Sequence, residues 1–189
     1  MKPEEVMKSI EAVAPKQGLP IIGPVRGAIL DDVIEEHPPK RILEVGTLVG
    51  YSAIRMGRHL TKGQKLTCVE VSEKMADVAR ANIKDAGLSD RIEVVVGDAK
   101  KVLSTLRGDF DMVFLDAAKD EYLTYLKSCE HLLHSGSVVM ADNVKSHAKE
   151  VSPYLKYVRG SGKYRSEYRE SPPSNGIDQA DAVEVSVRL

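Results

Sequence analysis

Five short apolar segments, separated by stretches of helix length, are the feature of this sequence that most limits its fold. The segments are rich in Val, Ile and Leu and show little polar–apolar alternation, which is typical of strands buried on both faces of a parallel sheet. They are RILEV (41–45), KLTCVEV (65–71), IEVVV (92–96), FDMVFL (110–115) and SVVMA (137–141). Because strands that alternate with helices form parallel units, the sequence predicts an open, doubly wound α/β sheet with helices on both faces.

The stretches between the segments have the pattern of amphipathic helices. Residues 72–87 predict one helix, which Gly87 would cap at its C-terminus. Residues 120–136 predict a second helix, which would stop at Gly136. The side chains expected on the buried faces are Met75, Val78, Ala79 and Ile83 in the first helix, and Leu123, Leu126, Leu132 and Leu133 in the second.

The two ends of the chain depart from this alternation. The first forty residues predict helices with a break at PKQGLPIIGP (15–24), a segment that we expect near the mouth of a binding site. A helix is expected around 147–158, followed by a strand over 163–170, a turn at SPPSNG (171–176) and a last strand over 182–189. Two strands with so short a connection pair antiparallel. The prediction is a mostly parallel seven-stranded sheet with an antiparallel last strand.

Composition places the chain among ordinary globular proteins. Its 189 residues fit one domain (1–189), and a net charge of −1 argues against a dedicated nucleic-acid binder. The first residues lack the apolar core of a signal peptide, and no apolar run is long enough to span a bilayer. Cys68 and Cys129 lie in apolar segments without metal-like spacing, so we expect reduced core residues. These features predict a cytoplasmic protein without membrane contact.

The first apolar segment leads into a glycine-containing turn. In an open α/β sheet, ligands bind beyond the carboxyl ends of the strands. In EVGTLVGYS (44–52), Gly46 allows a tight turn, and a helix that begins near Tyr51 and Ser52 offers free N–H groups to an anion. Leu48 stands where a dinucleotide motif has glycine, which disfavours a pyrophosphate and suits a cofactor with only a carboxylate there. A purely structural loop is the alternative.

The next two segments end in acidic residues. Glu70 follows Gly46 by 24 residues, and an acidic residue at this strand tip can accept both hydroxyls of a ribose. An exposed glutamate with no ligand is the alternative. The third segment ends at Gly97 and Asp98, where a short acceptor could meet the amino group of adenine. Together, the acidic strand ends predict a nucleoside-bearing ligand.

The last two segments end in three oxygen donors, which are Asp116, Asp142 and Asn143. Mg²⁺ prefers octahedral oxygen coordination with few protein carboxylates and with retained water or substrate oxygens. Two carboxylates and one amide oxygen leave about three positions open, of which a bidentate catecholate could occupy two. The alternative makes Asp116 and Asp142 helix N-caps.

Lys119 follows Asp116 by three residues, at the expected start of a helix. A helix N-terminus and a nearby divalent cation both disfavour the protonated amine, so Lys119 could take a proton from a hydroxyl that the metal has acidified. The alternative is a surface lysine. The small side chains of Ala117 and Ala118 leave the site open beside it.

These residues together resemble the cation-dependent class I O-methyltransferases that use S-adenosylmethionine. That family includes catechol O-methyltransferase and the caffeoyl-coenzyme A O-methyltransferase type. The resemblance runs from about residue 20 to the end and rests on LEVGTLVGYSAIRM (43–56), VFLDAAKDEY (113–122) and ADNV (141–144). It implies a Rossmann-like methyltransferase fold and Mg²⁺-dependent methyl transfer to a hydroxyl of a catechol-like aromatic diol.

The resemblance also implies a role for each site residue. The methionine part of the cofactor would be surrounded by Glu44, Gly46, Thr47 and Ser52. Glu70 would hold the ribose, Asp98 and Ala99 would lie near the adenine, and Ile22 would cover the cofactor. The ligands of Mg²⁺, or of another divalent cation, would be Asp116, Asp142 and Asn143, with Asp116 also close to the cofactor. Lys119 would be the general base.

The sequence departs from the family pattern in the wall of the acceptor site. In catechol O-methyltransferase a tryptophan precedes the catalytic lysine, whereas Ala118 stands there in this chain, which has no tryptophan. Glu170 or Glu167 would stand for the acidic residue that orients the second hydroxyl. A wider pocket with less aromatic stacking follows, and the natural acceptor stays open.

Two other functions fit parts of the sequence. Residues 145–170 hold seven Lys or Arg against three Glu, interleaved with tyrosines, and could grip a phosphate-bearing acceptor such as an acyl-coenzyme A or RNA. A solvated helix face is the simpler explanation. A module that binds S-adenosylmethionine without turnover is the third possibility, although it would have no need of Lys119 and the metal ligands. Monomer and homodimer are both open.

Overall fold

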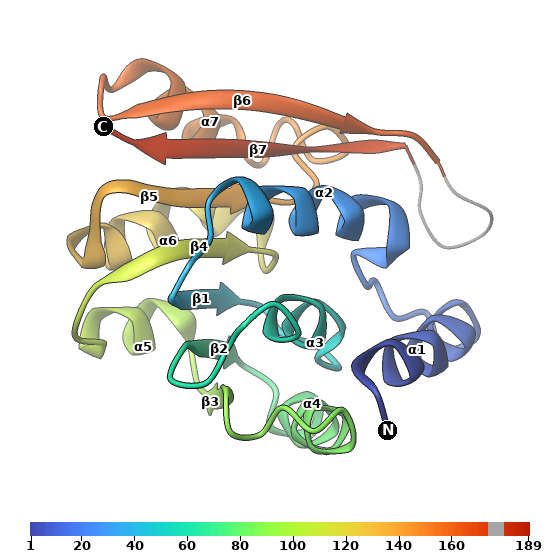
Figure 1. Ribbon diagram of the computed structural model, residues 1–189. Coiled ribbons are helices and arrows are strands. Elements are labelled where there is room, and N and C mark those ends of the chain that lie inside the picture. The colour runs from blue at the N-terminus through green and yellow to red at the C-terminus, as the bar shows by residue number, and fades with distance from the viewer. Residues whose placement is uncertain (174–179) are drawn as a thin grey trace.

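A seven-stranded sheet lies at the centre of the computed structural model, which describes residues 1–173 and 180–189 (Figure 1). The strand order is β3-β2-β1-β4-β5-β7-β6. The strands are β1 (Arg41–Val45), β2 (Lys65–Glu70), β3 (Ile92–Val96), β4 (Phe110–Leu115), β5 (Leu133–Ala141), β6 (Tyr164–Ser171) and β7 (Asp181–Arg188). The pairs among β1 to β5 are parallel, and β7 is antiparallel to both β5 and β6. The predicted fold class and antiparallel last strand are therefore confirmed.

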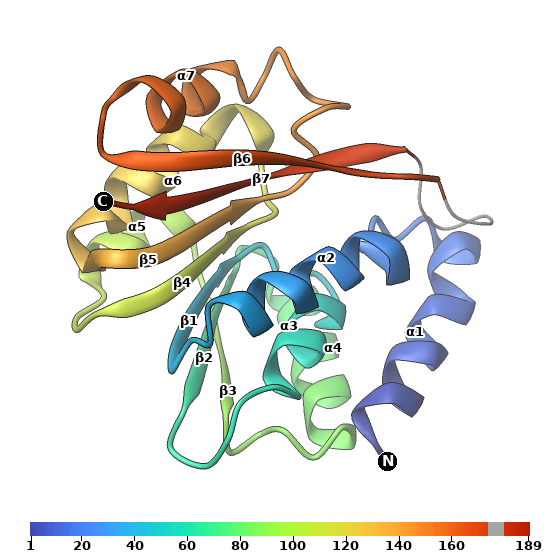
Figure 2. The same cartoon turned by 45° about the horizontal axis from the view of Figure 1, so that its top comes forward.

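Helices cover both faces of the sheet (Figures 1 and 2). One side carries α1 (Pro3–Gln17), α2 (Gly23–Glu36), α3 (Tyr51–Gly57) and α4 (Glu73–Asp85), with α1 packed on α3 and α4. The other side carries α5 (Ala99–Thr105), α6 (Tyr122–Cys129) and α7 (Ser152–Gly160). Single turns of 3₁₀ helix, η1 (Lys119–Glu121) and η2 (Glu130–Leu132), flank α6.

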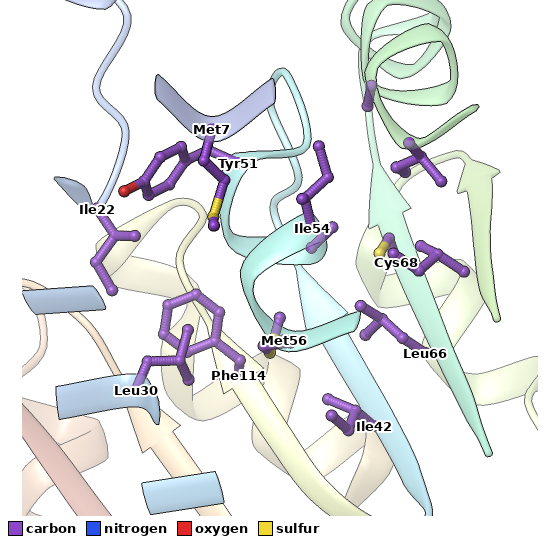
Figure 3. Close-up of a cluster of buried hydrophobic side chains, with 14 of the residues drawn as sticks. Met7, Ile22, Leu30, Ile42, Tyr51, Ile54, Met56, Leu66, Cys68 and Phe114 are labelled. Carbon is purple, nitrogen blue, oxygen red and sulfur yellow. The ribbon is translucent and has the colours of Figure 1, made fainter. Parts of the chain in front are cut away.

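Each face of the sheet has its own apolar core. Met112 and Phe114 of β4 point into the core on the α1–α4 side, and Val113 and Leu115 point into the core under α5, α6 and α7. This alternation follows from the two-residue period of a strand. Figure 3 shows the first core, to which Ile22 also belongs. Burial on both faces, as predicted, holds for the central strands, whereas β3 lies at the sheet edge and exposes Glu93 and Val96.

Two details of the predicted helices are wrong. Val78 is exposed on α4 because Ala76, Ala79 and Ile83 occupy the inward stripe of that helix. Gly136 does not stop a helix, because α6 ends at Cys129 and β5 begins at Leu133. The strand starts with an irregular bend in which His134 N–H donates to Ser137 Oγ and that hydroxyl donates to the Phe110 carbonyl. The predicted cap Gly87 is confirmed, with φ of 70° directly after α4 and its C-cap.

The ends of the chain largely follow the prediction. The helical break expected at 15–24 is observed between Gln17 and Gly23. The helix expected around 147–158 begins later, at Ser152. The turn predicted at 171–176 lies partly outside the described residues. Within residues 1–173 and 180–189, no helix combines the length and the apolar character that a membrane crossing requires.

The carboxyl ends of the five parallel strands, β1 to β5, lie along the same side of the sheet, which forms one edge of it. Backbone bonds continue the parallel ladders beyond the strands, from Asp116 N–H to the Val45 carbonyl at 2.9 Å and from Asp142 N–H to the Leu115 carbonyl at 3.0 Å. The strand order reverses direction between β1 and β4, which is where open α/β sheets bind ligands. The arrowheads of β1 and β4 point toward the side on which the α1–α2 connection lies (Figure 1).

Gly46 lies at this reversal, immediately after β1. Its φ of 91° is left-handed, and a Cβ atom there would lie 2.2 Å from the backbone oxygen of Asp116. Because backbone atoms cannot swing aside as a flexible side chain can, any larger residue would push β1 and β4 apart at their tips. The position therefore requires glycine for two independent reasons.

We predict that Gly46→Ala costs about 2–5 kcal/mol of unfolding free energy, the sum of left-handed strain and steric overlap. Gly63→Ala is the matched control, because Gly63 has nearly the same φ, 92°, and apart from its chain neighbours no described residue lies within 4 Å of its Cβ position. That control should cost only about 1–2 kcal/mol. Urea unfolding measures both values, and equal losses would contradict the close approach of Gly46 to Asp116.

Candidate active site

A cavity of about 950 Å³ opens at the edge where the strand tips meet. Its walls come from the α1–α2 connection and from the tips of β1 to β5. The predicted site residues that line it are Ile22, Gly46, Thr47, Ser52, Glu70, Asp98, Ala99, Asp116, Lys119 and Asn143. Glu44 and Asp142, the other two, are buried next to lining residues. The structure thus brings residues from across the sequence to a single site.

Glu70 holds the turn after β1 as well as lining the cavity. Its Oε2 accepts hydrogen bonds from the N–H groups of Thr47 (3.1 Å) and Leu48 (2.8 Å), and its Oε1 accepts one from Ser72 N–H (2.9 Å). The alternative of an exposed strand-end glutamate is wrong because the residue is buried. Leu48 has a left-handed φ of 49°, a strained conformation for a side-chain-bearing residue, which the bond to Glu70 helps to hold.

Glu44 lies behind the cavity wall, beneath the start of α3. Ser52 Oγ donates to Glu44 Oε1 at 2.5 Å, so this carboxyl group orients a hydroxyl that lines the cavity. Burial raises the pKa of Glu44 to about 7, because the charged form loses its hydration there. Asp98, which also lines the cavity, caps α5 by accepting a hydrogen bond from Lys100 N–H.

Two carboxylates lie close together at the tips of β4 and β5. Burial and the negative charge of Asp116 raise the pKa of Asp142, while Arg26 and Lys119 oppose that rise. Neither carboxylate is a helix cap, because Ala118 precedes η1 and Val151 precedes α7. The helix-cap interpretation of these residues is therefore wrong.

A cation faces each carboxylate. Arg26 Nε lies 3.1 Å from Asp142 Oδ1, and Lys119 Nζ lies 2.6 Å from Asp116 Oδ1. Lys119 also donates to the hydroxyl of Tyr122 (2.8 Å), which in turn donates to the backbone carbonyl of Asp142 (3.1 Å). The side chain of Lys119 is only 16% exposed, so the surface-lysine alternative is wrong.

The third oxygen donor, Asn143, is held in a defined orientation. Its φ of 61° is left-handed, a conformation that asparagine tolerates. Its Nδ2 donates to Asp181 Oδ2 at 2.9 Å, so the amide oxygen is the end left to face a ligand. Two carboxylates and an amide oxygen at neighbouring strand tips are the hard oxygen donors that Mg²⁺ prefers. The residues present therefore fit a divalent cation.

The site residues that the sequence did not point to include Arg26, Val71, Tyr122 and Asp181. Val71 is apolar yet 74% exposed beside Glu70, and its place directly after a strand-end acid was an available signal. Tyr122 follows Lys119 by three residues, which is a helical spacing. Arg26 and Asp181 carry no local signal, because each lies far along the chain from the residue that it contacts.

The acidic residues proposed for the acceptor wall lie elsewhere. Glu170 pairs with Lys145 and Glu167 pairs with Arg169, and neither glutamate lines the cavity. In the same segment, Arg159 pairs with Glu184. Local carboxylates thus balance several of the basic side chains of residues 145–170.

The family is decided by a match to known sequences. A family model described as O-methyltransferase matches residues 3–157. The chain belongs to the O-methyltransferase family. Catechol O-methyltransferase of Sus scrofa is 37% identical over 172 residues, which cover 84% of this chain and 91% of that protein. Catechol O-methyltransferase B of Danio rerio is 39% identical over 157 residues, which cover 79% of this chain. This chain spans only 59% of the Danio rerio protein.

Solved O-methyltransferase structures share the fold. The O-methyltransferase of Bacillus cereus, in complex with SAH, has a TM-score of 0.86 and 27% identity, with 98% of this chain and 91% of that chain covered. The O-methyltransferase TomG of Streptomyces achromogenes, in complex with SAM, also has a TM-score of 0.86, with 25% identity and coverage of 98% and 90%. The seven-stranded arrangement is thus that of the O-methyltransferases.

We predict that Glu44→Gln flattens the pH dependence of stability of this protein. Because folding raises the pKa of Glu44, its protonated form contributes to the free energy of unfolding. This contribution is fully present below about pH 4.5 and is lost as pH rises through about 7. The glutamine variant cannot lose this contribution, so its stability relative to wild type should improve between pH 5 and pH 8. Urea unfolding across that range measures the difference, and parallel curves for the two proteins would contradict a protonated Glu44.

Proposed function

We propose that this O-methyltransferase transfers the methyl group of S-adenosylmethionine to one hydroxyl of a catechol-like aromatic diol, with Mg²⁺ or another divalent cation. The observation that carries the proposal is the meeting of Asp116, Asp142, Asn143 and Lys119 at the tips of β4 and β5, beside the cavity. The cavity volume of about 950 Å³ gives room for a nucleoside cofactor together with a small acceptor.

The nucleoside half of the cavity supports the choice of methyl donor. Glu70 presents a carboxylate for the ribose hydroxyls, and the exposed apolar side chain of Val71 beside it suits the face of an adenine ring. Asp98 and Ala99 also line the cavity, and we expect them near the adenine amino group. The methionine end would lie over the Gly46 turn and Ser52. The Bacillus cereus structure is a complex with SAH, and the Streptomyces achromogenes structure is a complex with SAM. Both complexes support a ligand of this kind in the cavity of this protein.

Asp116, Asp142 and the amide oxygen of Asn143 would hold the divalent cation. When bound, the ion would lower the pKa of an acceptor hydroxyl and fix two neighbouring oxygens, which favours vicinal diols. Lys119 would accept the hydroxyl proton while the oxygen lone pair forms a bond to the methyl carbon and the carbon–sulfur bond breaks. The contribution of the protein is to align these three atoms and exclude water.

Lys119 needs two conditions to act as a base. It must be a neutral amine, so its ion pair with Asp116 must open during the cycle. It must also stay aimed at the acceptor, and the buried hydroxyl of Tyr122 provides that anchor. Tyr122 itself is fixed by an edge-to-face contact with Tyr154, with ring centroids 5.9 Å apart.

The acceptor end of the cavity has small and polar walls. Ala117 and Ala118 line the cavity next to Lys119 in the chain, and Ser146 and His147 line it shortly after Asn143. The small side chains of Ala117, Ala118 and Ser146 leave more space around the acceptor than large aromatic rings would. We therefore expect diols with bulky ring substituents to be accepted as well as simple catechols.

We predict that Lys119→Met lowers kcat by about 10²–10⁴-fold, the range that general-base catalysis contributes, with unchanged affinity for S-adenosylhomocysteine. Lys127→Met is the matched control, because Lys127 also pairs with a carboxylate three residues away but lies outside the cavity. The control should keep wild-type turnover. Steady-state rates and calorimetric titration measure both quantities, and full turnover by Lys119→Met would eliminate this lysine as the base.

We also predict that methyl transfer requires both a divalent cation and a vicinal diol. Labelled S-adenosylmethionine should label catechols in the presence of Mg²⁺, should not do so in excess chelator, and should do so again when Mg²⁺ is restored. Monophenols, acyl-coenzyme A thioesters and RNA belong in the same panel, with product mapping to locate the methyl group. Full activity in chelator would rule out the metal, and preferential labelling of a phosphate-bearing acceptor would rule out the small diol.

A further inference from the structure

Asp181, the first residue of β7, accepts hydrogen bonds from the loop that carries the metal ligands. Its Oδ2 accepts from Asn143 Nδ2 (2.9 Å) and from Ser146 Oγ (2.6 Å). Its Oδ1 accepts from the backbone N–H groups of Lys145 (3.2 Å), Ser146 (3.0 Å) and Ala182 (2.8 Å). A single carboxylate therefore ties residues 143–146 to the start of β7.

The chemistry of that carboxylate determines which end of the Asn143 side chain faces it. An ionised carboxylate only accepts hydrogen bonds, so it attracts the NH₂ end of an amide and repels the oxygen end. In the structure, Asn143, Ser146, Lys145 and Ala182 all donate hydrogen bonds to the carboxylate oxygens of Asp181, as an acceptor-only carboxylate requires. A metal ion needs the oxygen end of the amide, because the NH₂ group has no lone pair to offer.

We propose that Asp181 is a positioning residue for the metal site: it fixes the side chain of Asn143 with the amide oxygen toward the cation. The inference rests on the proposed function, because it requires a cation between Asp116, Asp142 and Asn143. Asp181 itself is buried and would not be a ligand of the cation. The surrounding backbone supports the role, since Val144 N–H also bonds to the carbonyl of Ala182 at 3.0 Å.

The substitution Asp181→Asn tests the orientation directly. The new amide keeps an oxygen for the three backbone N–H groups, so its NH₂ group takes the place of Oδ2 and faces Asn143. Asn143 would then turn its oxygen toward that NH₂ group and its own NH₂ group toward the cation. We expect the dissociation constant of Mn²⁺, followed by electron paramagnetic resonance, to rise about 10–100-fold.

A second substitution reverses the donor and acceptor. In the double variant Asp181→Asn/Asn143→Asp, the carboxylate at 143 accepts from the new amide with one oxygen and keeps another for the cation, at unchanged total charge. Because a carboxylate at 143 also raises affinity through charge, the single variant Asn143→Asp completes a double-mutant cycle. The substitution Asn143→Asp should raise the affinity for Mn²⁺ more in the Asp181→Asn background than in wild type. The two increases should differ by at least about tenfold.

The matched control is Glu184→Gln, on the same strand. Glu184 is also a buried carboxylate in a charged pair, with Arg159, and it has no hydrogen bond to the loop 143–146 among the described residues. This variant should bind Mn²⁺ as wild type does. A similar loss of Mn²⁺ affinity in Glu184→Gln and in Asp181→Asn would mean that the buried carboxylates of β7 affect the metal site only through the stability of the protein. That result would overturn the proposal.

The remaining outcomes separate the two claims. If wild type binds no Mn²⁺, the proposed metal-dependent function fails and this inference fails with it. If wild type binds Mn²⁺ and Asp181→Asn binds equally well, or if the double-mutant cycle is additive, only the positioning role fails. Should Asp181→Asn not fold, nuclear magnetic resonance of wild type decides. The side-chain amide protons of Asn143 should be protected from hydrogen exchange, and fast exchange would overturn the proposal.

Discussion

The backbone hydrogen bond from Asp116 N–H to the carbonyl of Val45 joins β1 and β4 one residue beyond the end of β4. It brings Asp116 against Gly46 so closely that no Cβ atom fits between them. The next bond along the sheet, from Asp142 N–H to Leu115, fixes the second carboxylate relative to the first. The geometry of the whole site follows from these ladders, because they fix the strand tips before any side chain is placed.

Asp142, held in this way, needs positive charge nearby, since burial and the negative charge of Asp116 both raise its pKa and so disfavour its ionisation. The chain supplies Arg26 from α2 and Lys119 from η1. Both cations belong to the protein, and their functions differ. Arg26 is buried against Asp142, whereas Lys119 can serve as a base only when another cation neutralises Asp116. A divalent ion would meet that requirement, which links metal binding to the availability of the base.

The strands and the strand-tip residues could be predicted from the sequence because they depend on local patterns. The segments 41–45, 92–96 and 110–115 were located to the residue, since apolar runs flanked by polar residues mark buried parallel strands. The start of β5 was missed because its irregular bend at Ser137 depends on the carbonyl of Phe110, far away in sequence. Arg26 and Asp181 were missed for the same reason: only the fold brings them to Asp142 and Asn143.

The proposed function requires the tips of β4 and β5 to form one divalent cation site. A crystal structure of the protein soaked in Mn²⁺, with an anomalous difference map, would locate the ion in such a site. We expect a single strong peak within about 2.0–2.6 Å of oxygens from Asp116, Asp142 and Asn143, the range of distances for hard divalent ions. The Lys119 ammonium group should also be displaced from Asp116. A map with no peak there, with the Lys119–Asp116 and Arg26–Asp142 pairs intact, would contradict the proposed site.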